Sequence, residues 1–271
     1  MEIMEAIASR QGLGLSVIII TKNEAARIAE CLASVRFADE IIVLDGFSID
    51  GTADIARAHG AQVHQVADWP GFGPQKNRVL ALATQPWVLS IDADERVTPE
   101  LQAEIIQTLV QPEYDGYRIA RLSEFCGKQI HHSGWWPDYV LRLFRRELST
   151  FDNVNVHEQV LVNGRVGHLK SWFLHFPFEN LDALVVKMNR YSGDAAKEMA
   201  LEGRRVGVFG LMRHSIWTFI RIYLLRRGFL DGRHGFVLAV TAASGSFLRY
   251  SKLMFLNEAN EQAKKNENSV Y

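Results

Sequence analysis

The sequence predicts an α/β fold, in which a mostly parallel sheet is flanked by helices and followed by a helical extension. Four short apolar runs rich in β-branched residues alternate with helical stretches in the first 110 residues, and the connections between them are short. This alternation is typical of a parallel, doubly wound sheet. The chain has 271 residues, 48% of them hydrophobic, so it can bury a sizeable core.

The elements can be placed from their periodicity and from the residues that interrupt it. Strands are expected at residues 15–20, 41–44, 61–66 and 87–91, and helices at 25–35, 52–57, 75–83 and 98–110. Further strands are expected at 116–122, 139–144, 154–160 and 170–176, and helices at 180–201, 208–225 and 235–255. We therefore expect an α/β domain over residues 1–178, a basic amphipathic helical extension over 179–256 and a polar tail over 257–271.

Charge is distributed unevenly along the chain. Residues 1–203 carry 19 Lys and Arg against 27 Asp and Glu, whereas residues 204–252 carry 9 against 1. The basic segment is also rich in aromatic and aliphatic residues, which indicates contact with an anionic surface such as a membrane. Basic residues interrupt its apolar runs, so no stretch is expected to span a bilayer. The two cysteines, Cys31 and Cys126, lack metal-ligand spacing and are expected to be core residues in a reducing compartment.

Carboxylates gather at the end of the strand predicted over residues 87–91, as Asp92, Asp94 and Glu95. Open α/β sheets bind their ligands at the carboxyl ends of the strands. Two carboxylates this close repel each other unless a cation lies between them, and a divalent metal that carries phosphate is the simplest one. A solvated turn explains this stretch alone equally well. Polar side chains also follow the strands predicted over residues 15–20 and 41–44, namely Asn23, Glu24 and Asp45. Their repetition at strand ends favours a shared ligand site.

Four motifs stand in an order and spacing that extend over residues 14–160. They are Thr21-Lys22-Asn23-Glu24, Asp45-Gly46-Phe47-Ser48-Ile49-Asp50-Gly51-Thr52, Gln75-Lys76-Asn77 and Asp92-Ala93-Asp94. Together they resemble the inverting nucleotide-sugar glycosyltransferases of family 2, which have the GT-A fold, although any one of them alone would be weak. Four further pieces resemble the lipopolysaccharide inner-core β-1,4-glucosyltransferases of that family: residues 71–77, Trp135-Trp136, Val156-His157-Glu158 and the turn at 228–232.

The resemblance implies a donor site at these strand ends. It makes Asp94 the ligand of a Mg²⁺ or Mn²⁺ ion that neutralises the leaving pyrophosphate, and it places Asp92 at the ribose or the sugar. Asp45 takes the family's base-recognition position, where a carboxylate can accept from uracil N3–H; a turn that caps the next helix is the alternative. Lys76 is expected near the phosphates or the donor sugar, with a solvated helix face as the alternative. The residues expected to line the nucleotide are Thr21, Asn23 and Glu24.

Inversion at the sugar needs a base on the acceptor side, and a carboxylate is the usual choice because it takes the hydroxyl proton. The resemblance favours Glu158, which stands in a strand-like stretch where the family keeps an acidic residue. Asp138, in the loop with the two tryptophans, is the alternative, followed by Asp152. A glutamate at a strand edge is more often solvated than catalytic, so the assignment of Glu158 depends on the resemblance.

Four other side chains have two interpretations each. Trp135 and Trp136 can offer an aromatic face to the acceptor sugar, or they can pack in the core or in a lid. His175 can supply a further metal ligand, or it can be a hydrogen-bonded core histidine. Glu95 has no assigned task and is expected to support its neighbours or to enter the next helix.

We therefore expect a metal-dependent enzyme that transfers a hexose, glucose from UDP-glucose, to a lipid-linked acceptor such as a heptose of the lipopolysaccharide inner core. The basic helices would hold it on the cytoplasmic face of the inner membrane, or would pack on the catalytic domain or a second subunit. Transfer of another sugar is one alternative, and a non-catalytic, membrane-associated nucleotide-binding scaffold is another. No nucleic acid is expected as a partner. An aspartyl-phosphate phosphatase is disfavoured because Ser48 stands where its nucleophile must precede Asp50.

Overall fold

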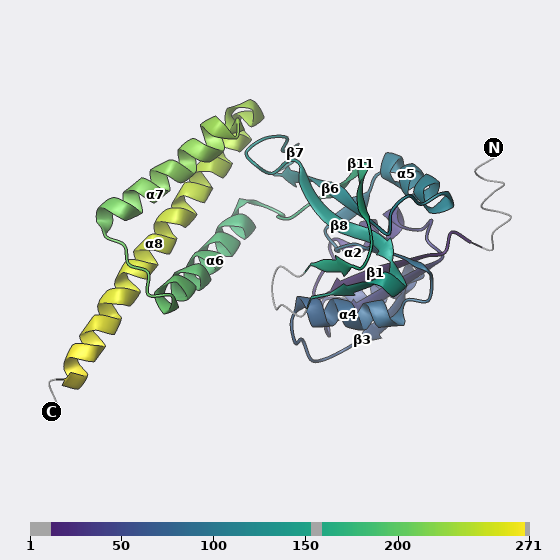
Figure 1. Ribbon diagram of the computed structural model, residues 1–271, viewed down its shortest axis with the longest axis horizontal. Helices are drawn as coiled ribbons and strands as arrows, with labels where there is room; N and C mark the ends of the chain where they lie inside the picture. Colours follow the sequence, from purple (N-terminus) through teal and green to yellow (C-terminus); the bar gives the residue numbers. More distant parts are fainter. Residues whose placement is uncertain (1–11, 153–158, 269–271) are drawn as a thin grey trace. The chain divides into compact units, whose positions relative to one another are not determined.

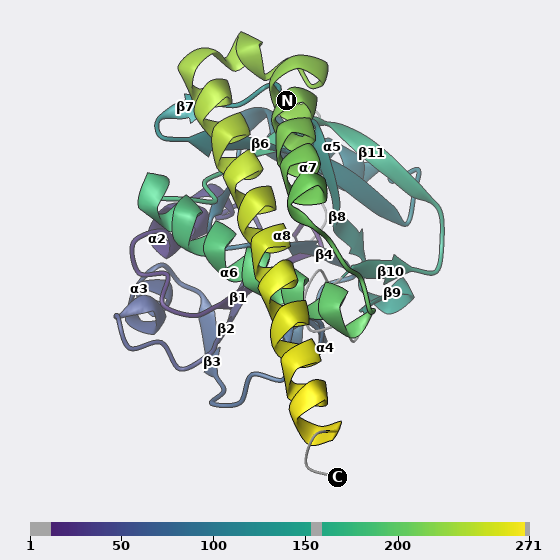
Figure 2. The same cartoon turned by 90° about the vertical axis from the view of Figure 1, so that its left-hand side faces the viewer.

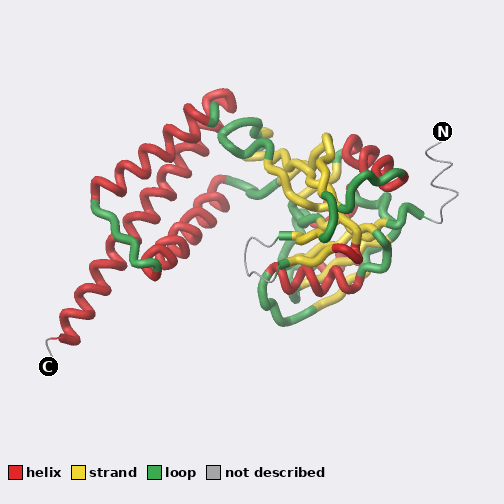
Figure 3. The backbone as a smooth tube through the Cα atoms, in the orientation of Figure 1, coloured by secondary structure: helices red, strands yellow, loops and turns green. Residues whose placement is uncertain are grey.

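The computed structural model describes residues 12–152 and 159–268, and these fall into two compact units. The α/β unit comprises Met1–Leu122 and Pro137–Phe176, and the helical unit comprises Ser123–Trp136 and Pro177–Tyr271. Figure 3 shows that nearly all strands belong to the α/β unit and that helices dominate the other. The sequence predicts one boundary, after residue 178, whereas the structure also assigns residues 123–136 to the helical unit.

The elements of the α/β unit alternate as expected up to β4 and then become mainly strands (Figure 1). The helices are α2 (Ile28–Ser34), α3 (Thr52–Ala58), α4 (Phe72–Leu82) and α5 (Pro99–Val110). The strands are β1 (Leu15–Thr21), β2 (Glu40–Asp45), β3 (Gln62–Gln65), β4 (Trp87–Ser90), β5 (Glu95–Val97), β6 (Gly116–Phe125), β8 (Asp138–Arg145), β9 (Ser149–Phe151), β10 (Val160–Val162) and β11 (Val166–His175). The strand expected at 154–160 lies almost wholly outside the described residues.

The main sheet has the strand order β3-β2-β1-β4-β8-β6-β11-β5, and its two halves differ in direction. β1 runs parallel to β2 and β4, and β2 runs parallel to β3. β8 is antiparallel to both β4 and β6, and β5 is antiparallel to β11. The parallel prediction therefore describes the first four strands only. Hydrophobic periodicity locates strands but does not fix the direction in which they pair, so the antiparallel half was not predicted.

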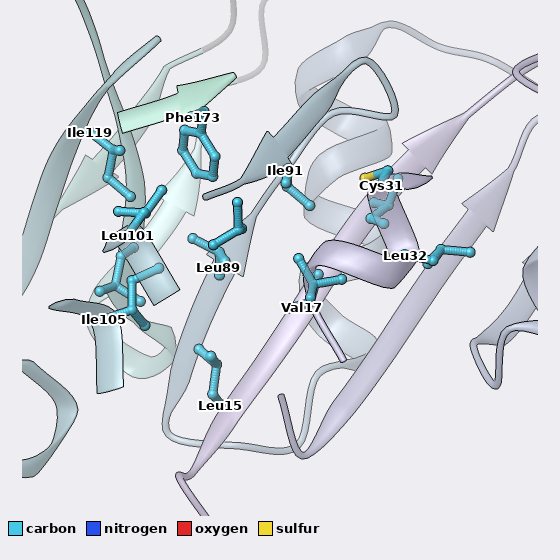
Figure 4. Packing of buried hydrophobic residues seen from close by; sticks show 14 of the residues in the cluster. Leu15, Val17, Cys31, Leu32, Leu89, Ile91, Leu101, Ile105, Ile119 and Phe173 are labelled. Carbon is cyan, nitrogen blue, oxygen red and sulfur yellow. The ribbon is translucent and has the colours of Figure 1, made fainter. Parts of the chain in front are cut away.

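Helices cover both faces of the parallel half, as shown by the alternation of side chains along β1. Val17 belongs to a cluster with Cys31 and Leu32 of α2, whereas Ile18 belongs to a cluster that includes Val79 of α4. Successive side chains of a strand point to opposite faces, so the two clusters are the two sides of the sheet. Figure 4 shows the first cluster, in which Leu89 of β4 and the following Ile91 lie between the side chains of α2 and those of α5.

The helical unit consists of long helices joined by a tight turn. Its helices are α6 (Leu181–Leu201), α7 (Val208–Ile220) and α8 (Gly232–Asn268), and α8 packs along both of the others (Figures 1 and 2). A short π-helical segment (Arg221–Leu225) and a 3₁₀ turn (Gly228–Asp231) connect α7 to α8. The tail expected after residue 256 is therefore helical as far as Asn268. Among the described residues, no helix is both long and apolar enough to cross a bilayer.

Asp231 fastens the hairpin segment 123–136 to these helices. This side chain is 2% exposed and accepts from the backbone N–H groups of His131 (3.2 Å) and His132 (3.1 Å) and from the Ser133 hydroxyl (2.9 Å). The turn also requires glycine, because a Cβ at Gly228 would lie 2.8 Å from the carbonyl oxygen of Ile222. The Gly-Phe-Leu-Asp-Gly motif therefore has a structural role in this unit.

The two cysteines occupy different environments. Cys31 is fully buried in α2, as expected for a core residue. Cys126 is exposed, so the prediction that it is a core residue is wrong. It stands with Gly127 between β6 and β7 (Lys128–Gln129), where its φ of 49° belongs to a tight turn at the surface.

Candidate active site

The Asp92–Glu95 turn follows β4 and is closed by the backbone and the side chain of Glu95. The Glu95 N–H donates to the Asp92 carbonyl (3.0 Å), and the Glu95 carboxylate accepts from the Asp92 N–H (3.0 Å). The carbonyl of Asp94 accepts from the N–H of Phe176, just after β11 (2.8 Å). Both aspartates are therefore held on a turn that is fixed at its two ends.

Asp92 lies between two cations that come from different elements. Lys76 of α4 donates to Asp92 Oδ1 (3.1 Å), and Arg142 of β8 donates to Asp92 Oδ2. Partial burial raises the pKa of Asp92, but the charges of Arg142 and Lys76 lower it more, so the pKa lies well below its usual range. The carboxylate keeps 33% of its surface exposed, which leaves it within reach of a ligand.

Lys76 is only 4% exposed, and its ammonium group also lies 5.7 Å from the centre of the Phe151 ring. The alternative of a solvated helix face is therefore wrong for this residue. A buried ammonium group needs negative partners, because burial without them is unfavourable. Lys76 therefore holds Asp92, and its contact with a phosphate group stays a prediction.

Glu95 continues the charge network away from Asp92. Its side chain is fully buried and accepts from Arg142 Nη2 (2.9 Å) and Arg121 Nη1 (3.4 Å). Arg121 in turn donates through Nε to Asp138 (2.9 Å), its register partner across β6 and β8. Glu95 therefore supports its neighbours and begins β5 rather than a helix.

Asp94 and His175 lie beside each other, as a shared metal site would require. Asp94 Oδ2 is 3.6 Å from His175 Nε2, and both side chains are largely buried, with 26% and 14% of their surfaces exposed. No cluster of three or more His, Cys, Asp or Glu side chains with metal-binding geometry occurs within residues 12–152 and 159–268. Mg²⁺ is often held by one or two carboxylates together with substrate phosphates, so Asp94 fits a metal that arrives with a nucleotide.

The loops after β1 and β2 are tied together at the same edge of the sheet. The Asn23 carboxamide accepts from the Ile49 N–H (3.0 Å), and the Glu24 N–H donates to the Thr52 hydroxyl (2.8 Å). Asp50 accepts from the backbone of both loops, at Ala25 and Thr52 (3.1 Å each). Asn23 and Glu24 are thus placed at the strand ends, as expected.

Asp45 is completely buried, and its carboxylate is already occupied. It accepts from the Ser48 N–H (3.0 Å), from the Ser48 hydroxyl and from Gln65 Nε2 (2.9 Å). This is the turn-forming geometry that was the alternative to base recognition. A role in binding uracil stays a prediction.

Several buried polar atoms of this edge lack a hydrogen-bond partner among the described residues. They include Thr21 Oγ1 at the end of β1, Gln75 Nε2 on α4 and Arg142 Nε on β8. Buried polar groups are usually paired, so such atoms indicate where a ligand or water completes the structure. Thr21 is the register partner of Asp45, α4 also carries Lys76, and Arg142 is itself the residue that donates to Asp92.

The remaining candidates are divided between the units. Trp135 and Trp136 belong to the helical unit, where Trp135 packs against Phe125 and Phe178, with ring centres 6.1 Å apart in each case. This packing is the structural alternative, and acceptor binding by the two tryptophans stays a prediction. Glu158, together with the neighbouring His157, lies outside the described residues. The other base candidate, Asp138, is paired with Arg121.

Arginines are the main part of the site that the sequence patterns do not predict. Arg142 interrupts an apolar strand, Tyr139-Val-Leu-Arg-Leu-Phe144, and is only 6% exposed. Arg96 is similarly buried and donates to the backbone carbonyls of Ala93 (2.7 Å) and Arg27 (2.8 Å). A charged residue in the middle of a buried strand was the available signal, because such a residue must be paired.

Residues 16–163 match the family described as Glycosyl transferase family 2, and the chain belongs to this family. It is a glycosyltransferase. It is 34% identical to an uncharacterized glycosyltransferase of Rickettsia prowazekii over 94% of this chain and 92% of that protein. It is 32% identical to the lipopolysaccharide core biosynthesis glycosyltransferase LpsC of Rhizobium meliloti over 89% of this chain and 92% of that protein.

Two solved structures are also similar to this chain. The first is Staphylococcus aureus TarS 1–349 in complex with UDP-GlcNAc, which is 16% identical over 92% of each chain with a TM-score of 0.48. The second is glucosyl-3-phosphoglycerate synthase of Mycobacterium tuberculosis in complex with Mn²⁺, UDP and glucosyl-3-phosphoglycerate. It is 25% identical over 54% of this chain and 61% of that chain, with a TM-score of 0.40.

Proposed function

We propose that this glycosyltransferase is metal-dependent and inverting, and that it transfers glucose from UDP-glucose to a heptose of a lipid-linked lipopolysaccharide core. The observation that carries the donor side of the proposal is the Asp92–Glu95 turn, with Lys76 and Arg142 on Asp92 and His175 beside Asp94. The acceptor side is supported by the relative LpsC, whose name assigns it to lipopolysaccharide core biosynthesis.

The roles of the residues follow from the charge of the donor. A Mg²⁺ or Mn²⁺ ion supplies charge neutralisation to the leaving nucleoside diphosphate. Asp94 and His175 would hold this ion, and Lys76 would contribute a second positive charge toward the diphosphate. Asp92, which is partly exposed, would accept from hydroxyl groups of the ribose or the sugar.

The acceptor hydroxyl needs a base that removes its proton as the oxygen attacks the anomeric carbon. We assign this role to Glu158, with Asp138 as the alternative. Asp138 already holds Arg121, so using it as the base would oppose an existing ion pair. The variants Glu158→Gln and Asp138→Asn separate the two assignments, because the base variant loses transfer while its affinity for UDP changes little.

We place the enzyme at the cytoplasmic face of the inner membrane, and the exposed apolar and basic side chains of the helical unit support the membrane contact in this proposal. Its turn exposes Leu225, Phe229 and Leu230, each about half or more exposed, next to Arg226 and Arg227. An apolar groove of about 570 Å³ also runs between α7 and α8. Apolar side chains beside arginines suit the boundary between acyl chains and anionic headgroups.

The first experiment is a panel of nucleotide sugars with a heptose-terminated lipopolysaccharide core as acceptor, assayed with Mn²⁺ or with EDTA. We expect transfer from UDP-glucose with inversion, and loss of transfer in EDTA. Preference for a galactosyl, N-acetylhexosaminyl or guanosine donor would replace the glucose assignment. A protein that gives no calorimetric response to UDP with Mn²⁺ would be a scaffold instead.

The second experiment measures sedimentation of the wild-type protein with vesicles of phosphatidylcholine, with and without phosphatidylglycerol. We expect binding that requires the anionic lipid and weakens with salt. An absence of vesicle binding together with a stable dimer would assign the exposed helices to a subunit interface.

A further inference from the structure

Arg142 and Glu95 form a buried ion pair directly behind Asp92. We propose that Arg142, held by Glu95, is a positioning residue that sets the orientation of the Asp92 carboxylate for the nucleotide-sugar donor. The assignment rests on the proposed function, because it takes Asp92 to be the donor-binding carboxylate. It adds a residue that acts on the donor through Asp92, from a strand that none of the recognised motifs includes.

The geometry places Arg142 between two carboxylates of unequal exposure. Its Nη2 atom donates both to Glu95 Oε1 (2.9 Å) and to Asp92 Oδ2. Glu95 is completely buried, whereas 33% of the Asp92 side chain is exposed. Glu95 thus fixes the guanidinium from inside the protein, and the guanidinium fixes the carboxylate that reaches the surface.

Glu95 also holds the backbone of the residue that Arg142 orients. Its Oε2 atom accepts from the Asp92 N–H (3.0 Å), and its own N–H donates to the Asp92 carbonyl (3.0 Å). Glu95 therefore holds the backbone of Asp92 directly and its side chain through Arg142. A partner that holds a ligand-binding group from behind in this way commonly fixes its orientation.

The two cations on Asp92 differ in what they can fix. Lys76 brings a compact charge on a flexible chain, whereas the guanidinium of Arg142 is planar, so the two N–H bonds of its Nη2 atom point in fixed directions toward Asp92 and Glu95. Lys76 can neutralise Asp92, but Arg142 can also set the direction of its oxygens. The orienting role therefore falls to Arg142.

One feature argues against a purely structural ion pair. Arg142 Nε is buried and has no hydrogen-bond partner among the described residues. A pair that serves folding alone is expected to satisfy its buried donors, since an unpaired one is destabilising. Arg142 leaves its Nε donor unpaired, at a cost in folding free energy, while its Nη2 atom donates to Asp92.

The test is Arg142→Lys, which keeps the charge and removes the planar guanidinium that fixes the direction of the two N–H bonds. We expect KM for UDP-glucose to rise about tenfold, kcat to fall less, and the dependence on Mn²⁺ to remain. The matched control is Arg145→Lys on the same strand, whose side chain pairs with Asp115 (3.4 Å) away from this network. Its KM should stay within twofold of the wild-type value. An unchanged KM in Arg142→Lys would overturn the proposal.

A double-mutant cycle separates orientation from general stability. If Arg142 acts through Asp92, Arg142→Lys should change KM by less than about twofold in an Asp92→Asn background, because coupled residues are not additive. Independent effects that multiply in the double variant would contradict the role. Should Arg142→Lys fail to fold, Glu95→Gln takes its place in the cycle, since it keeps an oxygen for the Asp92 N–H and removes the charge that holds Arg142.

The wild-type protein distinguishes this inference from the proposed function. If wild-type enzyme does not use UDP-glucose, the function fails before the variants are compared. If it does and the variants retain its KM, the function stands and the positioning role is rejected.

Discussion

The α/β unit and the helical unit place their charged and apolar side chains in opposite ways. In the α/β unit, charges such as Asp45, Glu95 and Arg142 are buried at the edge where the strands end. In the helical unit, large apolar side chains such as Phe209 and Trp217 are exposed, with 83% and 52% of their surfaces accessible. Burying charges and exposing large apolar side chains both cost free energy in an isolated folded chain. Each arrangement therefore indicates a ligand or a partner surface outside the chain.

The difference indicates what kind of partner each unit meets. Buried charges that neutralise one another leave a polar site prepared for a small charged ligand. In the proposed function, the exposed apolar helices and their arginines meet a broad surface that carries anionic groups. The two units can therefore be tested separately, by changing a charge in one and an apolar side chain in the other.

The largest expected effect is on Asp94, the proposed metal ligand. Asp94→Ala should lower transfer on the order of 10²–10³-fold, because the leaving diphosphate loses the charge that stabilises it. UDP affinity should also stop responding to Mn²⁺, which calorimetry can measure. Asp54→Ala is the control, since that side chain is 86% exposed on α3. Retention of metal-dependent transfer by Asp94→Ala would rule out the ligand assignment.

Asp231 tests whether the helical unit also depends on a buried charge. Asp231→Ala leaves the N–H groups of His131 and His132 without an acceptor, so we expect a loss of about 3 kcal/mol in the free energy of unfolding. Urea unfolding followed by tryptophan fluorescence measures it. Asp194→Ala, at an exposed position of α6, should change stability by less than about 0.5 kcal/mol. Equal stability of the two variants would contradict the anchoring role.

The exposed turn between α7 and α8 tests the apolar side of the comparison. The double variant Phe229→Ser, Leu230→Ser should bind anionic vesicles about tenfold more weakly, because it removes apolar area that enters the headgroup boundary. Cosedimentation measures the change, and transfer to a soluble acceptor should be unaffected. Leu201→Ser, at a 90% exposed position, is the matched control. If both variants lost vesicle binding equally, the turn would not be the element that binds the membrane.

The smallest effect concerns Glu40, at the opposite end of β2 from Asp45. Partial burial raises the pKa of Glu40, but hydrogen bonds from Ser16 and Thr84 lower it more, so it lies below its usual value of 4.5. A carboxyl with a lowered folded-state pKa stabilises the fold above its unfolded-state pKa, and this contribution disappears as pH falls through the folded-state pKa.

Glu40→Gln should therefore lower stability by about 1 kcal/mol at pH 7, and the difference should shrink below about pH 4.5. Urea unfolding at several pH values tests this. Glu147→Gln, with a side chain 81% exposed, should match the wild-type protein throughout. A difference that stays constant down to pH 3 would show that the charge of Glu40 is irrelevant.

The sequence was sufficient for the parts that depend on local pattern. The apolar runs at β1, β2 and β4 and the polar residues that follow them were recognised, and the motifs identified the family. Thr98 followed by Pro99 also marked the start of α5, where the Thr98 hydroxyl accepts from the Leu101 N–H (3.1 Å). These features are visible because neighbouring residues produce them.

The arginine network could not be predicted because strand register produces it. Arg121 meets Asp138 only because β6 and β8 are antiparallel in that register, and Arg142 reaches Asp92 only because β8 pairs with β4. A shift of one residue would turn these side chains to the other face. Such long-range pairing has no local signal beyond a charged residue in an apolar strand.

Cys31 lies beneath the turn that carries the two aspartates, so the reactivity of its thiol can report whether the turn is open. Its thiol donates to the Asp92 carbonyl (3.5 Å), and burial raises the pKa of the thiol well above its usual range. Thiolate is the reactive form, so Cys31 should resist alkylation while the turn is closed. Cys126 is exposed and serves as the reactive reference in the same chain. The rate at which Cys31 becomes labelled therefore measures how often the turn opens, and a donor that closes the site should slow it.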